Sequence, residues 1–199
     1  MAVTLSFAQH ESVFVVFPKE GGKGLTPGCT RCTVNEITGP WTLSFQRDAL
    51  HRGPAEPVAL ERLIDLSAST NLAVRHYSGK IVYRTKFTCA PIPCNRVFLN
   101  LGEVAVTAKV KVNGRHVGGT CFAPYRLDVT PFVMDGKNDL EIEVCNLWIN
   151  RLAADVGMEN SPTWLSWGKW CESWGTNPPS AKSGLLGPVR IETTELVKE

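Results

Sequence analysis

VFLNLGEVAVTAKVKVNGRHVGGTCFAPYRLDVTPFVMDGKNDLEIEVCNLW, residues 97–148, carries the clearest structural signal of this chain. Apolar and polar residues alternate in three parts of it, which is the two-residue period of a half-buried strand. Asn113-Gly114 and Asp135-Gly136 are dipeptides that tolerate the positive φ angles of tight reversals between strands. The stretch therefore predicts a sheet that is folded back on itself.

Short alternating segments continue on both sides of this stretch. In residues 41–45, the side chains of Trp41, Leu43 and Phe45 share one face. The other predicted strands are residues 79–87, 97–101, 104–112, 116–117, 125–129, 140–144 and 189–197. Residues 60–66 suit one helical turn. About eight to ten short strands with almost no helix predict an all-β fold, a jelly-roll β-sandwich.

Glycine and proline divide the chain near its beginning. Residues 12–17 are an apolar run that fits one buried strand, and the Gly- and Pro-rich residues 18–28 suit neither a strand nor a helix. We therefore expect three parts. Residues 1–17 form the terminal strand of a preceding domain or an edge strand, residues 18–34 form a linker, and residues 35–199 form the sandwich module.

The composition excludes several classes of partner. The 21 Lys and Arg are scattered among 19 Asp and Glu, which argues against a nucleic-acid-binding surface. The longest apolar runs are too short to span a membrane, and the first residues lack an export signal. If the chain is an internal piece of a longer protein, we expect that parent to be periplasmic or extracellular.

Seven cysteines leave at least one thiol unpaired within the chain. Cys29 and Cys32 have the spacing of half a zinc knuckle, but no second pair completes four ligands. Cys89 and Cys94 could be bridged across a hairpin loop, although separate thiols are the preferred interpretation. The sequence therefore predicts no cofactor. It leaves a metal unassigned, and a structural calcium ion has no supporting Asp-rich loop.

Residues 149–186 lack strand signals and hold the candidate ligand-binding residues. Helical spacing would place Trp164, Trp167, Trp170 and Trp174 on one face. A pyranose stacks on aromatic rings and hydrogen-bonds to polar side chains, which Asn150, Arg151 and Asp155 supply nearby. The favoured alternative is that these tryptophans form a lid over one end of the sandwich.

Arg75 and Tyr77, at the start of a predicted strand, are further candidates for ligand contact. An Arg beside an aromatic residue also serves to orient a loop by pairing with a carboxylate, and this second role is preferred.

Three segments in order carry a family resemblance: residues 110–118, with Asn-Gly after a strand; residues 124–130, with Asp-Val-Thr; and residues 136–144, with Gly-Lys-Asn before a strand. This pattern resembles the sugar-binding-type, galactose-binding-like jelly-roll domain of glycoside hydrolase family 2 and its relatives. Residues 74–79, 146–152 and 183–189 narrow the resemblance to the C-terminal jelly-roll module of family 106-type α-L-rhamnosidases. In that family Asn-Arg-Leu is followed by Gly-Asp, whereas here Ala153-Ala154-Asp155 keeps the acid without the glycine.

The resemblance implies a non-catalytic module of a multidomain bacterial glycoside hydrolase. Its partners would be the catalytic domain of the parent chain and a carbohydrate. Hydrolysis in these families uses two carboxyl groups of a barrel domain of roughly 250 residues, which this chain cannot contain beside the sandwich. Glu141 and Glu143 alternate in the manner of the solvent face of a strand, so we assign no catalytic residue. An autonomous carbohydrate-binding module and a purely structural domain remain the alternatives.

Overall fold

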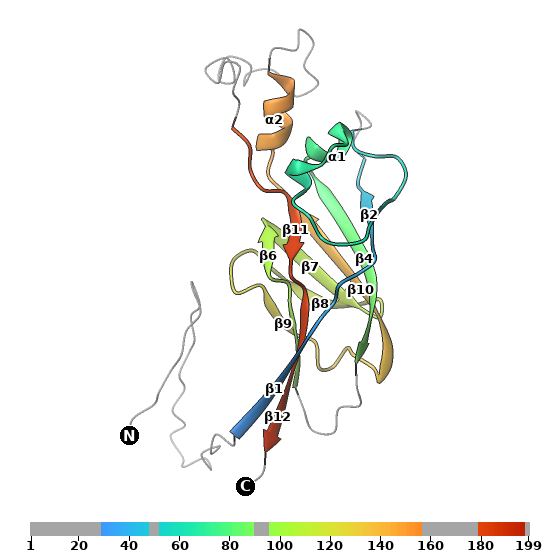
Figure 1. Ribbon diagram of the computed structural model, residues 1–199, viewed down its shortest axis with the longest axis vertical. Coiled ribbons are helices and arrows are strands. Elements are labelled where there is room, and N and C mark those ends of the chain that lie inside the picture. Colours follow the sequence, from blue (N-terminus) through green and yellow to red (C-terminus); the bar gives the residue numbers. More distant parts are fainter. Residues whose placement is uncertain (1–28, 48–51, 90–95, 157–178, 198–199) are drawn as a thin grey trace, which may run out of the picture.

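The computed structural model describes residues 29–47, 52–89, 96–156 and 179–197 (Figure 1). Strands dominate the described part of the chain. They are β1 (Cys29–Glu36), β2 (Trp41–Phe45), β3 (Val58–Leu60), β4 (Lys80–Cys89), β5 (Arg96–Asn100), β6 (Glu103–Ala105), β7 (Thr107–Val112), β8 (Arg115–Thr120), β9 (Arg126–Asp128), β10 (Gly136–Cys145), β11 (Gly184–Gly187) and β12 (Arg190–Val197). The helical segments are η1 (Leu66–Ala68), α1 (Leu72–Arg75) and α2 (Ile149–Asp155).

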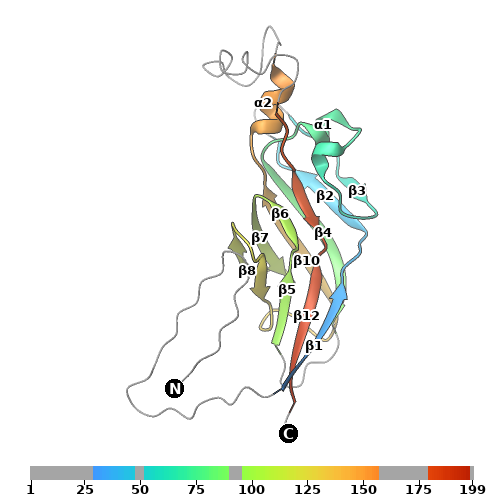
Figure 2. The same ribbon diagram turned by 60° about the vertical axis from the view of Figure 1, so that its left-hand side comes forward.

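The strands form two main antiparallel layers and one small sheet. The six-stranded sheet has the order β3-β2-β4-β10-β7-β8, the four-stranded sheet has the order β1-β12-β5-β9, and β11 pairs with β6. Figure 2 shows β12 and β5 lying over β4 and β10, with α1 and α2 at one end of the sandwich. The predicted all-β sandwich is confirmed.

Alternation along the strands separates the core from the outer surfaces. In β10, Leu140, Ile142 and Val144 are buried, whereas Asp139 is exposed and Glu141 and Glu143 are partly exposed. The same period buries every second residue of β7, and every second residue over most of the length of β4. The largest buried side chains between the layers include Trp41 and Tyr83, whose rings meet edge to face. The predicted solvent face at Glu141 and Glu143 is therefore present.

Several boundaries differ from those expected. Strand β1 begins at Cys29 and pairs along its length with β12, so residues 29–34 belong to the sheet and not to a linker. The described side chains of β1, residues 32–36, are all exposed, so the strand has no apolar alternation to reveal it. The helical turn expected in residues 60–66 lies further along the chain, in η1 and α1. Residues 1–28 lie outside the described part.

The hairpin predicted at Asn113-Gly114 joins β7 to β8. Both residues have positive φ angles, 51° and 75°, as a two-residue turn of this kind requires. The Asn113 amide also donates to the side chain of Asn138 and to the carbonyl oxygen of Phe132. The turn is therefore fixed by tertiary contacts as well as by local conformation.

None of the helices in the described ranges is long and apolar enough to cross a membrane.

Candidate functional site

The predicted site residues on α2 are engaged in contacts within the fold. The buried Asn150 side chain donates to the carbonyl oxygen of Ala181 (2.7 Å) and accepts from the amide of Ala181 (2.8 Å). Arg151 and the buried Asp155, one helical turn apart, form a two-bonded ion pair. Asn150 therefore fixes α2 to the segment that leads into β11, and Asp155 holds the guanidinium of Arg151 on the helix.

The two candidates near α1 have different surroundings. Tyr77 is buried, its ring packs edge to face on Phe45, and its hydroxyl lies 2.6 Å and 2.9 Å from the carbonyl oxygens of Gln46 and Lys80. Arg75 is half-buried, and its Nε donates to the carbonyl oxygen of Ser69 (2.7 Å). Arg75 thus orients the loop between η1 and α1 through a backbone carbonyl, where the sequence suggested a carboxylate.

Of the candidates that the structure describes, Arg75 and Asn150 line a common hollow. A pocket of about 130 Å³ lies between the helical segments, lined by Ser67, Arg75, His76, Asn150, Ala153, Pro179 and Ser180. Arg151, Asp155 and Tyr77 do not line it. Trp164, Trp167, Trp170 and Trp174 lie outside the described residues, so the aromatic platform stays a prediction.

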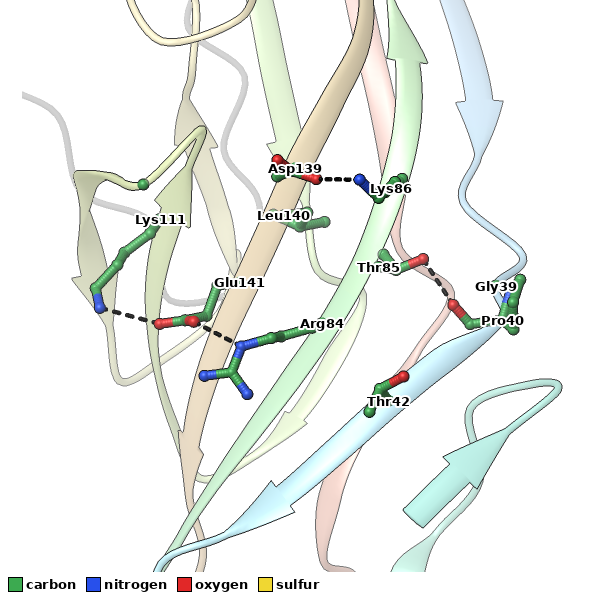
Figure 3. A pocket seen from close by; sticks show the side chains of 11 residues that line it. Gly39, Pro40, Thr42, Arg84, Thr85, Lys86, Lys111, Asp139, Leu140 and Glu141 are labelled. Atoms are coloured by element: carbon green, nitrogen blue, oxygen red, sulfur yellow. Dashed lines mark hydrogen bonds and ion pairs between the residues drawn. The ribbon is translucent and has the colours of Figure 1, made fainter. Parts of the chain in front are cut away.

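A larger groove lies elsewhere, on the outer face of the six-stranded sheet. Its volume is about 650 Å³, and it crosses four neighbouring strands (Figure 3). The lining residues are Gly39, Pro40, Thr42, Arg84, Thr85, Lys86, Lys111, Gly114, Asp139, Leu140 and Glu141. The groove is therefore built on regular strands, whose pairing fixes the positions of its side chains.

Register brings the charged groups of the groove together. Glu141 on β10 lies opposite Arg84 on β4 and opposite Lys111 on β7. Its two carboxylate oxygens accept from Arg84 Nε (2.9 Å) and Lys111 Nζ (3.0 Å), which Figure 3 shows as one row across three strands. The hydrogen bond from Lys111 and the positive charge of Arg84 lower the pKa of Glu141. Glu141 is therefore held as an anion.

A second ion pair lies two residues earlier in β10. Lys86 Nζ lies 3.0 Å from an Asp139 carboxylate oxygen, and both side chains are well exposed. The Thr85 hydroxyl donates to the carbonyl oxygen of Pro40 (2.8 Å), which joins β4 to the segment before β2. The lining thus combines three cations, two carboxylates and the apolar surface of Pro40. This arrangement suits the binding of a polar molecule.

Sequence reasoning did not identify this groove. It recognised Glu141 and Glu143 as solvent-facing, but Arg84 and Lys111 are far from them along the chain. The signal that could have found it is the charged alternation in residues 80–86, 107–111 and 139–143, combined with antiparallel pairing of the three strands.

Metal-binding groups do not gather in the described ranges: no cluster there has three or more His, Cys, Asp or Glu side chains placed to hold an ion. Cys32, Cys89, Cys121 and Cys145 have free thiols, so Cys89 is not bridged to Cys94. Burial raises the pKa of the Cys89 thiol. The preferred interpretation of separate thiols holds for these four residues.

Comparison with known proteins finds similar sequences and structures in glycosidases. Residues 64–169, just over half of the chain, match the family described as glycosyl hydrolase 2 galactose-binding domain-like. A Formosa agariphila protein with the name "Putative beta-glucuronidase" is 33% identical over 78% of this chain and 15% of its own length. The rhamnosidase of Novosphingobium sp. PP1Y has a similar structure, with a TM-score of 0.70 and 33% identity over 85% of this chain and 16% of its own.

A more distant likeness shows the fold alone. The β-D-glucuronidase of Dictyoglomus thermophilum has a TM-score of 0.55 and 20% identity over 82% of this chain and 28% of its own. This chain therefore spans only a small part of the glycosidases that it resembles. By its matched sequence and its fold, the chain belongs to the glycosyl hydrolase 2 galactose-binding domain-like family.

Proposed function

We propose that this chain is a non-catalytic accessory module of a larger glycoside hydrolase and that it packs on the catalytic domain of the parent protein. The observation that carries the proposal is coverage. The chain corresponds to about one sixth of the length of the two similar glycosidases, with 15% of one and 16% of the other. Most of each of those proteins therefore lies beyond the sandwich.

The carboxyl groups of the groove support a non-catalytic role. A glycosidase needs a carboxylic acid that keeps its proton until it reaches the glycosidic oxygen, which calls for a raised pKa. The pKa of Glu141 is lowered by Lys111 and Arg84. Asp139, the other carboxylate of the groove, is paired with Lys86. Glu141 is therefore better suited to holding cations in place than to donating a proton.

The specificity of the parent belongs to the same proposal. We propose an α-L-rhamnosidase-type parent, which the 33% identity to a rhamnosidase supports. The alternative is a β-glucuronidase parent, which the equal identity to the Formosa protein supports.

Hydrolysis assays on the full 199-residue chain test the accessory role. We expect no release of nitrophenol above background from the 4-nitrophenyl glycosides of α-L-rhamnose, β-D-glucuronic acid and β-D-galactose. The matched control is Glu141→Gln, which removes a groove carboxylate at nearly constant shape. Turnover that follows the chain through purification and disappears in this variant would contradict the proposal.

The tryptophan-rich connection is a separate part of the proposed function. Trp164→Ala and Trp170→Ala are expected to weaken glycan binding if these rings form a platform. Binding that is unchanged in both variants on a glycan array would leave the lid as the better interpretation.

A further inference from the structure

Positive charge is concentrated on the outer face of the six-stranded sheet. Six cations and three carboxylates lie on this face of β4, β7 and β10: Lys80, Arg84, Lys86, Lys109, Lys111, Lys137, Asp139, Glu141 and Glu143. The face therefore carries a surplus of three positive charges, while the whole chain has a net charge of only +2. The rest of the molecule therefore has a net charge close to zero, and this face holds the excess positive charge of the chain.

The groove on this face offers more hydrogen-bond donors than acceptors. Lys111 and Lys86 each direct one contact to a carboxylate, and an ammonium group has three N–H bonds. Arg84 uses Nε for Glu141 and Nη1 for the Ser44 hydroxyl (3.2 Å). The remaining N–H bonds of these three cations line the same groove. A ligand that brings its own anionic oxygens would match them.

Size and lining favour an oligosaccharide over other anions. A volume of about 650 Å³ lies within the range of about 300–1,000 Å³ that is typical of small-molecule sites. None of the described residues that line the groove is aromatic, so neither a nucleobase nor a sugar ring would stack here, and a sugar would be held by hydrogen bonds and charge. The hydroxyl of Thr42 and the apolar surface of Pro40 suit the hydroxyls and C–H faces of a sugar.

We propose that this groove binds an anionic oligosaccharide, whose carboxylate or sulfate groups are held by Arg84, Lys86 and Lys111. Glu141 positions Arg84 and Lys111 across the sheet. It also competes with the ligand for these two cations. The inference extends the proposed accessory function without depending on it, because binding and hydrolysis are measured separately. Loss of one leaves the other standing.

Titration calorimetry on the full chain tests the ligand class. The probes are tetragalacturonate, its neutral methyl ester, a sulfated malto-oligosaccharide and a glutamate peptide of equal charge. We expect the acid form to bind about tenfold or more tightly than the ester at low ionic strength, and to weaken as salt is added. The sulfated probe distinguishes a sulfate from a carboxylate ligand. Equal affinity for acid and ester, equal affinity for the peptide, or no binding of either charged sugar would overturn the proposal.

Paired variants then test the site. Lys86→Met combined with Lys111→Met is expected to reduce the affinity about tenfold, whereas Lys182→Met, an exposed lysine paired with Glu103 outside this groove, should leave it unchanged. Glu141→Gln is expected to raise the affinity several-fold, because it releases Arg84 and Lys111 for the ligand. General damage to the fold would lower the affinity in all of them. Opposite shifts at Glu141 and the lysines therefore support the site, and equal shifts overturn it.

Discussion

At the scale of single residues, Gly184 at the start of β11 is constrained on all sides. Its φ angle is +95°, and a β-carbon there would overlap the Tyr83 hydroxyl and lie 3.0 Å from the Leu66 side chain. Gly114 has a similar φ of +75° with nothing nearby. We expect Gly184→Ala to cost about 3–4 kcal/mol of unfolding free energy and Gly114→Ala about 1–2, because only the first adds a clash to the backbone strain. Urea unfolding of both variants measures the difference, and equal losses would contradict it.

Asn146, between β10 and α2, is a buried polar hub. Its amide donates to the Tyr77 carbonyl oxygen (2.8 Å) and to the Ser183 hydroxyl (2.7 Å), and its oxygen accepts from the Gly79 amide (2.8 Å). We expect Asn146→Leu to lower the unfolding free energy by about 3 kcal/mol or more, because two buried partners and the partly buried Gly79 amide lose their bonds.

The control for this prediction is Asn35→Leu. Asn35 is exposed on β1, so its replacement should change the unfolding free energy by less than about 0.5 kcal/mol. Chemical denaturation of the two variants provides the comparison. A loss at Asn146 as small as that at Asn35 would mean that the network relaxes around the leucine.

At the scale of elements, the cross-strand ion pairs of β10 should make stability depend on pH. Glu141 has a lowered pKa in the folded state, so its contribution is present above the pKa of the unfolded carboxyl and is lost as pH falls through the folded value. Half of each partner side chain, Arg84 and Lys111, is exposed, which limits the contribution to about 0.5–1 kcal/mol.

Glu141→Gln should therefore destabilise the protein at about pH 7 and converge with the wild type in acid, below the folded pKa of Glu141. Glu143→Gln is the matched control, since Glu143 has one longer contact, 3.7 Å to Lys80. Urea unfolding as a function of pH gives both curves. A difference between wild type and Glu141→Gln that stays constant into acid would exclude the ion pairs as its cause.

The elements also show which structures the sequence could reveal. Strands β2, β4, β7 and β10 bury every second side chain over much of their length, so alternation located them and with them the sandwich. Strand β1 is exposed along its described side chains, and β11 is the short segment Gly-Leu-Leu-Gly. Both are held by backbone hydrogen bonds to strands that are distant in sequence. Such pairing does not require an alternation of apolar and polar residues, so the sequence pattern did not reveal these two strands.

At the scale of the whole molecule, the two candidate sites differ in how much of them is local. Asn150 and Arg151 are neighbours in sequence, and residue type alone made them candidates. The contact of Asn150 with Ala181 depends on the packed end of the sandwich, whereas Arg151 pairs with Asp155 within one turn of α2. The groove needs Arg84, Lys111 and Glu141 from three strands, and only the register of the folded sheet unites them. Sequence patterns therefore predicted the scaffold better than the site.

One hydrogen bond joins the six-stranded sheet to the small sheet. The buried Tyr83 hydroxyl on β4 accepts from the amide of Leu185 on β11 (3.1 Å). Burial raises the pKa of Tyr83 well above its ordinary value of about 10, although the bond from Leu185 acts in the opposite direction. Tyr83 therefore stays protonated in the folded protein at pH values where the unfolded chain would lose that proton.

The stability cost of Tyr83→Phe should become smaller as the pH rises from neutral to alkaline. At about pH 7 the variant loses about 1–2 kcal/mol of unfolding free energy, because the Leu185 amide is left buried without an acceptor. Above the unfolded pKa of about 10, the wild type loses stability with rising pH, and the variant lacks this contribution. The difference in unfolding free energy between wild type and variant should narrow in urea unfolding at about pH 10.5.

The control is Tyr125→Phe, which removes the hydroxyl of a half-buried tyrosine with one long bond of 3.4 Å and should change the unfolding free energy little. A gap for Tyr83→Phe that widens with pH would show that its hydroxyl ionises in the folded state.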